Sequence, residues 1–151
     1  MTPTEAELDA LDRVIALARD RHTPGDGPVF TAAVVRDDKL LALSENESRK
    51  ECDPSRHAEV VAIAEAARAT GETMLPGATL VASMQPCEMC LAAMRWARID
   101  RLVFAMTQEA APKFFRFPRL SITDFAAAGE PFAWAGGIGQ EQVAHIYGDI
   151  A

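Results

Sequence analysis

The sequence lacks any apolar run long enough to span a membrane, and its acidic, amphipathic start over residues 1–14 does not resemble a secretory leader. Basic residues are also scarce, because 15 Lys and Arg stand against 22 Asp and Glu, for a net charge of −7. The one local cationic cluster, Lys113, Arg116 and Arg119, is more typical of a solvated face. No Gly-rich loop or Arg cluster offers a phosphate site. We therefore expect a cytoplasmic protein that does not bind membranes, and the charge balance disfavours a nucleic-acid partner without excluding a local basic patch.

Cysteine is the other scarce residue. The chain has three, and two of them, Cys87 and Cys90, stand three positions apart. In a chain without a recognisable secretory leader, so few cysteines indicate reduced thiols and disfavour a framework of disulfide bonds. The pair therefore points to metal binding or redox chemistry.

Apolar periodicity divides the chain into alternating helices and strands. The predicted order is a helix over 8–18, strands over 29–35 and 40–43, a helix over 60–67, a strand over 78–83, a helix opening at 86–90, a strand over 102–105, a short helix ending at 128, an extended segment over 131–135 and a last helix over 141–150. This alternation predicts a single α/β domain over residues 1–151, with helices on both faces of the sheet.

Several helix starts carry candidate capping residues. Asp53 or Ser55 can cap the helix that contains residues 60–67, and Ser121 or Thr123 can cap the short helix near the end. Pro86 is predicted in the first turn of its helix, where proline is tolerated.

Two helix starts carry the residues with the most specific chemistry. The segment from His57 opens one helix and the segment Pro86–Cys90 opens another, with 30 positions between His57 and Cys87. The pattern fits the H-x-E…P-C-x-x-C signature of zinc deaminases. Tetrahedral zinc accepts imidazole and thiolate ligands, and three protein ligands leave a fourth position for water. We predict that His57, Cys87 and Cys90 bind one Zn²⁺ ion.

The carboxylate of Glu59 follows His57 by two positions, so it would lie beside the metal without binding it. We predict that Glu59 is the catalytic acid and base of a hydrolytic reaction. A redox dithiol or a lone capping histidine explains only one half of the pattern. A non-catalytic zinc module would need a fourth ligand and has no use for Glu59; Cys52 is the one candidate, and we expect it to be a free thiol.

Both segments resemble the cytidine deaminase-like superfamily, in particular its guanine deaminase and tRNA adenosine deaminase branch. The resemblance is specific over 53–63 and 79–99 and weaker through 136–141. It implies a three-layer α/β/α sandwich with a mixed five-stranded sheet, and a homodimer. It also implies hydrolytic deamination of a small nucleobase, nucleoside or analogous heterocycle of guanine or cytosine type. The alternative within the branch is a tRNA adenosine deaminase.

The resemblance further assigns substrate contacts. Asn46 matches an asparagine that hydrogen-bonds the base, and the backbone near Ala58 would contact it too; a loop asparagine that closes a turn is the alternative for Asn46. Gln85 departs from the pattern, because many relatives carry Glu before the motif proline. The basic carboxy-terminal helix of tRNA-acting relatives and the tail that closes the site of guanine deaminases are not visible in residues 139–151.

Aromatic side chains are candidates for stacking on a planar ring. The four phenylalanines considered are Phe30, Phe114, Phe115 and Phe117, with Phe30 and Phe114 as the preferred pair. Since most aromatic residues belong to the core, fewer than about half of the four are expected to touch substrate.

Overall fold

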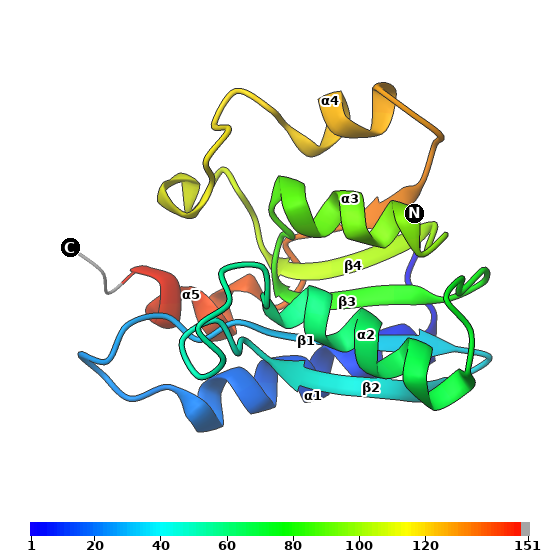
Figure 1. The fold of residues 1–151 in the computed structure, drawn as a ribbon. Helices are drawn as coiled ribbons and strands as arrows, with labels where there is room; N and C mark the ends of the chain where they lie inside the picture. The colour runs from blue at the N-terminus through cyan, green and yellow to red at the C-terminus, as the bar shows by residue number, and fades with distance from the viewer. Residues whose placement is uncertain (149–151) are drawn as a thin grey trace.

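The sheet has five strands in the order β2-β1-β3-β4-β5 (Figure 1). We describe it in a computed structural model that covers residues 1–148. The strands are β1 (Thr31–Arg36), β2 (Lys39–Glu45), β3 (Thr79–Met84), β4 (Arg101–Met106) and β5 (Ala133–Ala135). β1 is antiparallel to β2 and β3, whereas β3, β4 and β5 run parallel to one another. The predicted mixed five-stranded sheet is thereby confirmed.

Helices cover both faces of this sheet, as Figure 1 shows. They are α1 (Glu5–Arg21), α2 (Ala58–Thr70), α3 (Glu88–Trp96), the 3₁₀ turn η1 (Pro112–Phe114), α4 (Ile122–Ala127) and α5 (Gln140–Gly148). Alternate strand residues feed the two cores: Val34 and Leu80 pack with α2 and α3, and Val35 and Val81 pack with α1 and α5. The predicted three-layer α/β/α arrangement is confirmed. Among residues 1–148, no helix combines the length and apolarity of a membrane span.

An ion pair with a buried carboxylate connects the start of α1 to the first residues of β3 and β4. Glu7 is only 3% exposed and accepts hydrogen bonds from Arg101 Nε at 2.7 Å and from Thr79 Oγ1 at 2.6 Å. Burial alone would raise the pKa of Glu7, but the bonds from Arg101 and Thr79 outweigh it and lower the pKa to about 2. The start of the first helix is therefore fixed on strands that are distant in sequence.

The caps and ends of the helices differ from the prediction in a few places. Ser121 caps α4 as predicted, but neither Asp53 nor Ser55 caps α2, because Asp53 accepts two hydrogen bonds from Ser55 and so closes a local turn. Pro86 lies just before α3 and not in its first turn. The predicted end of the last helix, at residue 150, lies outside the described residues.

Candidate metal centre and active site

The two helices α2 and α3 each begin at a residue with a metal-binding side chain. His57 is the N-cap of α2 and Cys87 is the N-cap of α3. A typical N-cap side chain accepts a bond from its own helix, but neither of these does so. Their backbone carbonyls still accept the first helical bonds, from Val61 and Leu91. Neither side chain is therefore used to cap its helix, and both remain available to a shared ligand.

These side chains meet Cys90 in one group. His57 Nδ1 lies 3.5 Å from Cys87 Sγ and 3.6 Å from Cys90 Sγ, and the two sulfurs are 3.7 Å apart. Tetrahedral zinc with bonds of about 2.3 Å to sulfur and about 2.0 Å to nitrogen would separate the sulfurs by about 3.8 Å and each sulfur from nitrogen by about 3.5 Å. The three donor atoms therefore already have the spacing of a zinc site, and the group is positioned to bind a metal.

The same closeness changes the acidity of the thiols. The hydrogen bond with Cys90 lowers the pKa of Cys87 to about 4, and the bond with His57 adds to this effect against the opposing influence of burial. The bond with Cys87 and burial raise the pKa of Cys90, and the bond with Cys87 raises the pKa of His57. One thiolate is thus ready to ligate, and metal binding would displace the remaining protons.

Glu59 borders this group from the first turn of α2. Its carboxylate lies 3.4 Å from Cys90 Sγ, and the residue is only 5% exposed. Burial raises the pKa of Glu59 to about 7. A carboxyl group with this acidity near neutral pH can both accept and return a proton.

A pocket with a volume of about 70 Å³ adjoins the donor group, with His57, Cys87 and Glu59 in its wall. Aromatic side chains form much of its wall, and Asn46 and Gln85 add amide groups. The lining residues are Phe30, Asn46, His57, Glu59, Met84, Gln85, Cys87, Phe114 and Phe115. Sites for drug-sized ligands occupy about 300 Å³ or more, so a pocket of this volume is limited to a small ligand.

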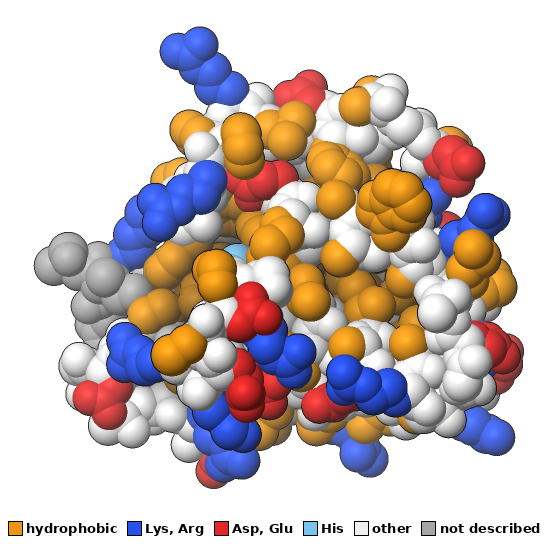
Figure 2. All heavy atoms as spheres, viewed as in Figure 1, with side chains coloured by type: hydrophobic (Ala, Val, Ile, Leu, Met, Phe, Trp, Pro, Cys, Tyr) orange, Lys and Arg blue, Asp and Glu red, His pale blue; other side chains and the backbone are white. Residues whose placement is uncertain are grey.

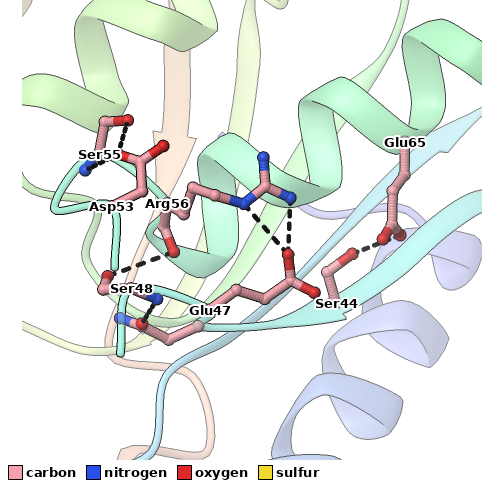
Figure 3. A network of polar contacts seen from close by, with 8 residues as sticks. Ser44, Glu47, Ser48, Asp53, Ser55, Arg56 and Glu65 are labelled. Atoms are coloured by element: carbon pink, nitrogen blue, oxygen red, sulfur yellow. Dashed lines mark hydrogen bonds and ion pairs between the residues drawn. The ribbon is translucent and has the colours of Figure 1, made fainter. Parts of the chain in front are cut away.

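Polar contacts among Glu47, Ser48 and Arg56 connect the two ends of the loop before α2 (Figure 3). Arg56 Nη2 donates to Glu47 Oε1 at 2.6 Å, and the Arg56 carbonyl accepts a bond from the Glu47 N–H at 3.0 Å. The Ser48 N–H donates to Asn46 Oδ1 at 2.8 Å. Because its oxygen is engaged within the loop, Asn46 has its amide N–H groups left to offer the pocket.

The structure brings most of the predicted site residues together. Phe30, Phe114 and Asn46 all line the pocket, but Phe117 does not and is 61% exposed. Ala58 is fully buried at the start of α2, and its side chain is absent from the pocket wall. The predicted contact of its backbone with the base remains a prediction. Cys52 is an exposed free thiol and does not belong to the donor group.

Phe115, one of the four phenylalanines considered for stacking, lines the pocket. The sequence did not predict Met84 or Gln85 as pocket residues, and the structure places both on its wall. Gln85 follows the end of β3, and the carboxyl ends of parallel strands are common ligand sites, a signal that could have found it. Its Oε1 accepts from the Gln108 N–H at 3.1 Å, and its Nε2 donates to Gln108 Oε1 at 3.4 Å. A neutral amide pair therefore replaces the charge that a glutamate would bring.

Fold and site together define an α/β/α protein with a three-ligand metal centre, an adjacent buried carboxyl group and a small aromatic pocket. The chain belongs to the family of the cytidine and deoxycytidylate deaminase zinc-binding region, whose model matches residues 4–106. The match confirms the resemblance that the two metal-binding segments indicated, and zinc is the metal of this family.

Individual relatives fall into two groups. A guanine deaminase of Bacillus subtilis is 37% identical over 95 residues, which are 63% of this chain and 61% of the relative. A tRNA-specific adenosine deaminase of Agrobacterium fabrum is 38% identical over 93 residues, 58% of this chain and 61% of the relative. The chain thus spans about six tenths of the length of these curated relatives.

The fold of one solved structure matches the fold of this chain over nearly the whole length of both. It comes from a study of A-to-I editing by tRNA:A34 deaminases at the wobble position of transfer RNA, and it matches with a TM-score of 0.73 at 28% identity, covering 95% of this chain and 99% of that one. The relatives therefore include deaminases of both a free base and a tRNA.

Proposed function

We propose that the protein is a zinc-dependent hydrolytic deaminase that converts an exocyclic amino group of a small nucleobase, nucleoside or similar heterocycle to a carbonyl. One observation carries the proposal: the His57, Cys87 and Cys90 donor atoms converge beside a small pocket that His57, Cys87 and Glu59 line. A structural zinc site needs neither a pocket nor an adjacent buried carboxyl group. The arrangement is therefore that of a reaction centre.

Each residue has a defined part in the proposed reaction. His57, Cys87 and Cys90 would hold the zinc ion, which activates water as a nucleophile for the amino-bearing ring carbon. Glu59 takes one proton from the water as its oxygen bonds to the ring carbon, and passes this proton to the ring nitrogen. It then takes the second proton from the new hydroxyl group and delivers it to the leaving amine. The C–N bond breaks as the new C–O bond becomes a carbonyl, so one water is consumed and one ammonia is released.

The pocket wall supports a specific orientation of the ring. Phe30, Phe114 and Phe115 offer flat apolar surface on which a heterocycle can stack. Asn46 presents amide N–H groups, because its oxygen accepts the bond from Ser48, and these donors select a ring with an acceptor atom on that edge. We propose guanine or a similar aminated base as the substrate, which is consistent with the guanine deaminase relative.

A specific observation favours tRNA as the second candidate substrate. The segment that carries the Lys113, Arg116 and Arg119 cluster also supplies Phe114 and Phe115 to the pocket wall. Cations beside the pocket could contact phosphates while a flipped adenine enters it. Against this stand the net charge of −7 and the small size of the cluster.

We also propose that the protein forms a homodimer. Figure 2 shows hydrophobic side chains gathered over α3 and beside α4 on one face of the molecule. Trp96 is 85% exposed there, and it borders a surface cavity of about 540 Å³ that Phe125 and Met74 also line. Exposed apolar surface of this kind is typical of protein interfaces. Sedimentation of the wild type and of Trp96→Glu tests this point, with a shift toward monomer expected for the variant.

Ammonia release from a substrate panel tests the proposed function. The panel contains bases, nucleosides, nucleotides, aminotriazines and unmodified tRNA, each incubated with the zinc-loaded protein. We expect turnover of at least one free base or nucleoside and none of tRNA. Conversion of adenosine in tRNA, with every small molecule inert, would replace the proposed substrate by the second candidate. Inactivity on the entire panel would contradict the deaminase proposal for these substrates.

A further inference from the structure

The outer wall of the pocket is built by the segment 107–121, which connects β4 to α4. The phenylalanines of this segment differ in exposure: Phe114 and Phe115 line the pocket, while Phe117 is 61% exposed. Phe114 also contacts the rings of Phe30 and Tyr147, with centroids 5.5 Å and 5.9 Å away. The wall therefore depends on where a surface segment of little regular structure is held.

One carboxylate connects this segment to the metal-binding helix. Glu88 Oε1 accepts hydrogen bonds from the backbone N–H of Arg116 at 3.1 Å and of Phe117 at 2.8 Å. Glu88 is the first residue of α3 and stands between Cys87 and Cys90 in the sequence. Hydrogen bonds to an ionised acceptor are stronger than neutral ones, and two of them here converge on one oxygen. The side chain of Glu88 thus links α3 to the segment that carries the aromatic wall.

We propose that Glu88 is a positioning residue that holds the Phe114–Phe115 wall over the pocket and thereby sets the affinity for the ring. This inference rests on the proposed deaminase function for its kinetic consequence, but the structural link does not depend on it. Glu88 is not among the residues that line the pocket, so it acts through the wall and not by contact with substrate. We expect Glu59 and the three donor residues to keep their places when the segment loosens, because Glu88 has no bond to them among the contacts of the described residues.

Loss of the acceptor has a predictable effect on the kinetics. In Glu88→Ala, two backbone N–H groups exchange a carboxylate for water, and the segment spends more time away from the pocket. Stacking surface is lost from ground state and transition state alike, which raises KM with little change in kcat. We expect KM to rise about tenfold, which corresponds to about 1.4 kcal/mol, with kcat within about threefold of wild type.

Two matched variants isolate the hydrogen bonds from the charge. Glu88→Gln also removes the negative charge at the start of α3 but retains an oxygen that can accept both bonds. It should restore KM to near the wild-type value. Glu109→Ala removes an exposed carboxylate from the same segment, and Glu109 has no hydrogen bond to the wall among the contacts of the described residues. It should behave as wild type.

Hydrogen exchange of the zinc-loaded, full-length protein gives a readout that needs no substrate. The amides of Arg116 and Phe117 should exchange faster in Glu88→Ala than in wild type, and at near wild-type rates in Glu88→Gln and Glu109→Ala. Unchanged exchange in Glu88→Ala would overturn the proposal. So would loss of zinc from that variant, or a fall in kcat without a rise in KM. If no ring is turned over at all, the exchange result still decides the role of Glu88 separately from the proposed function.

Discussion

Replacement of Glu59 by glutamine should separate catalysis from folding. Glutamine preserves the shape of the side chain but can neither accept nor return the protons that deamination moves. A positioned acid–base group typically contributes about 10² to 10⁴ in rate. Because Glu59 would serve two successive transfers, we expect kcat to fall about 10³-fold, or about 4 kcal/mol in activation free energy.

The same substitution should increase stability. Burial raises the pKa of Glu59 from 4.5 to about 7, so the charged form is unfavourable in the folded protein. A raised carboxyl pKa means that the folded state loses stability as the pH rises from about 4.5 to about 7. In protein stripped of zinc by a chelator, Glu59→Gln should therefore be more stable above pH 7, by up to about 3 kcal/mol.

Steady-state ammonia release and denaturant unfolding measure the two effects on the same samples. Glu65→Gln is the matched control, because Glu65 lies on the same helix and its bond from Ser44 Oγ at 2.7 Å can be retained by the amide oxygen. The control should keep wild-type turnover. If Glu59→Gln also kept wild-type turnover, the proton transfers would belong to another group and the reasoning would be refuted.

Two further predictions concern the supports of the fold. Glu7→Gln should destabilise the protein by about 3 kcal/mol at neutral pH, because the pKa of Glu7 is lowered from 4.5 to about 2 by its bonds to Arg101 and Thr79 against the effect of burial. This stability is fully present above about pH 4.5 and is lost as the pH falls toward 2. Denaturation should therefore show the full variant deficit at pH 7 and less than about half of it at pH 3; an equal deficit at both would contradict the assignment. Tyr147→Phe should cost about 1 to 2 kcal/mol, since the hydroxyl donates to the Val29 carbonyl at 2.6 Å in a buried setting. An unchanged melting temperature would show that this bond contributes nothing.

Local chemistry explains why the metal centre was predictable from sequence. His57 and Cys87 each stand immediately before an apolar helix, and the short spacings to Glu59 and Cys90 fix their relative placement. The strands were predicted for a similar reason, since their apolar runs are bounded by turn residues. Features that depend on neighbours within one or two helical turns could therefore be predicted from the sequence.

Contacts between segments that are distant in the sequence could not be predicted in the same way. Glu88 meets the N–H groups of Arg116 and Phe117 across 28 and 29 positions, and no local pattern marks such a pairing. Phe115 and Phe117 are two positions apart and equally apolar, yet one is buried in the wall and the other is 61% exposed. The path of the connecting segment decides this difference, and that path is set by tertiary packing.

The cap of α2 shows how function can override a local preference. Asp53 and Ser55 are both good capping residues, but they bond to each other and leave the N-cap position to His57. A histidine there offers no capping bond to the helix, and the Glu47–Arg56 pair holds the loop instead. The helix start thus uses a residue that suits a metal in place of one that suits the helix.

Zinc analysis of purified protein tests the central claim most directly. The wild type should carry about one zinc per chain, because His57, Cys87 and Cys90 form a three-ligand site with the spacing of tetrahedral coordination. Cys87→Ser should lose most of that zinc, and Cys52→Ser, which changes an exposed thiol outside the group, should retain it. Absence of zinc from the wild type, or equal zinc in the wild type and Cys87→Ser, would contradict the account.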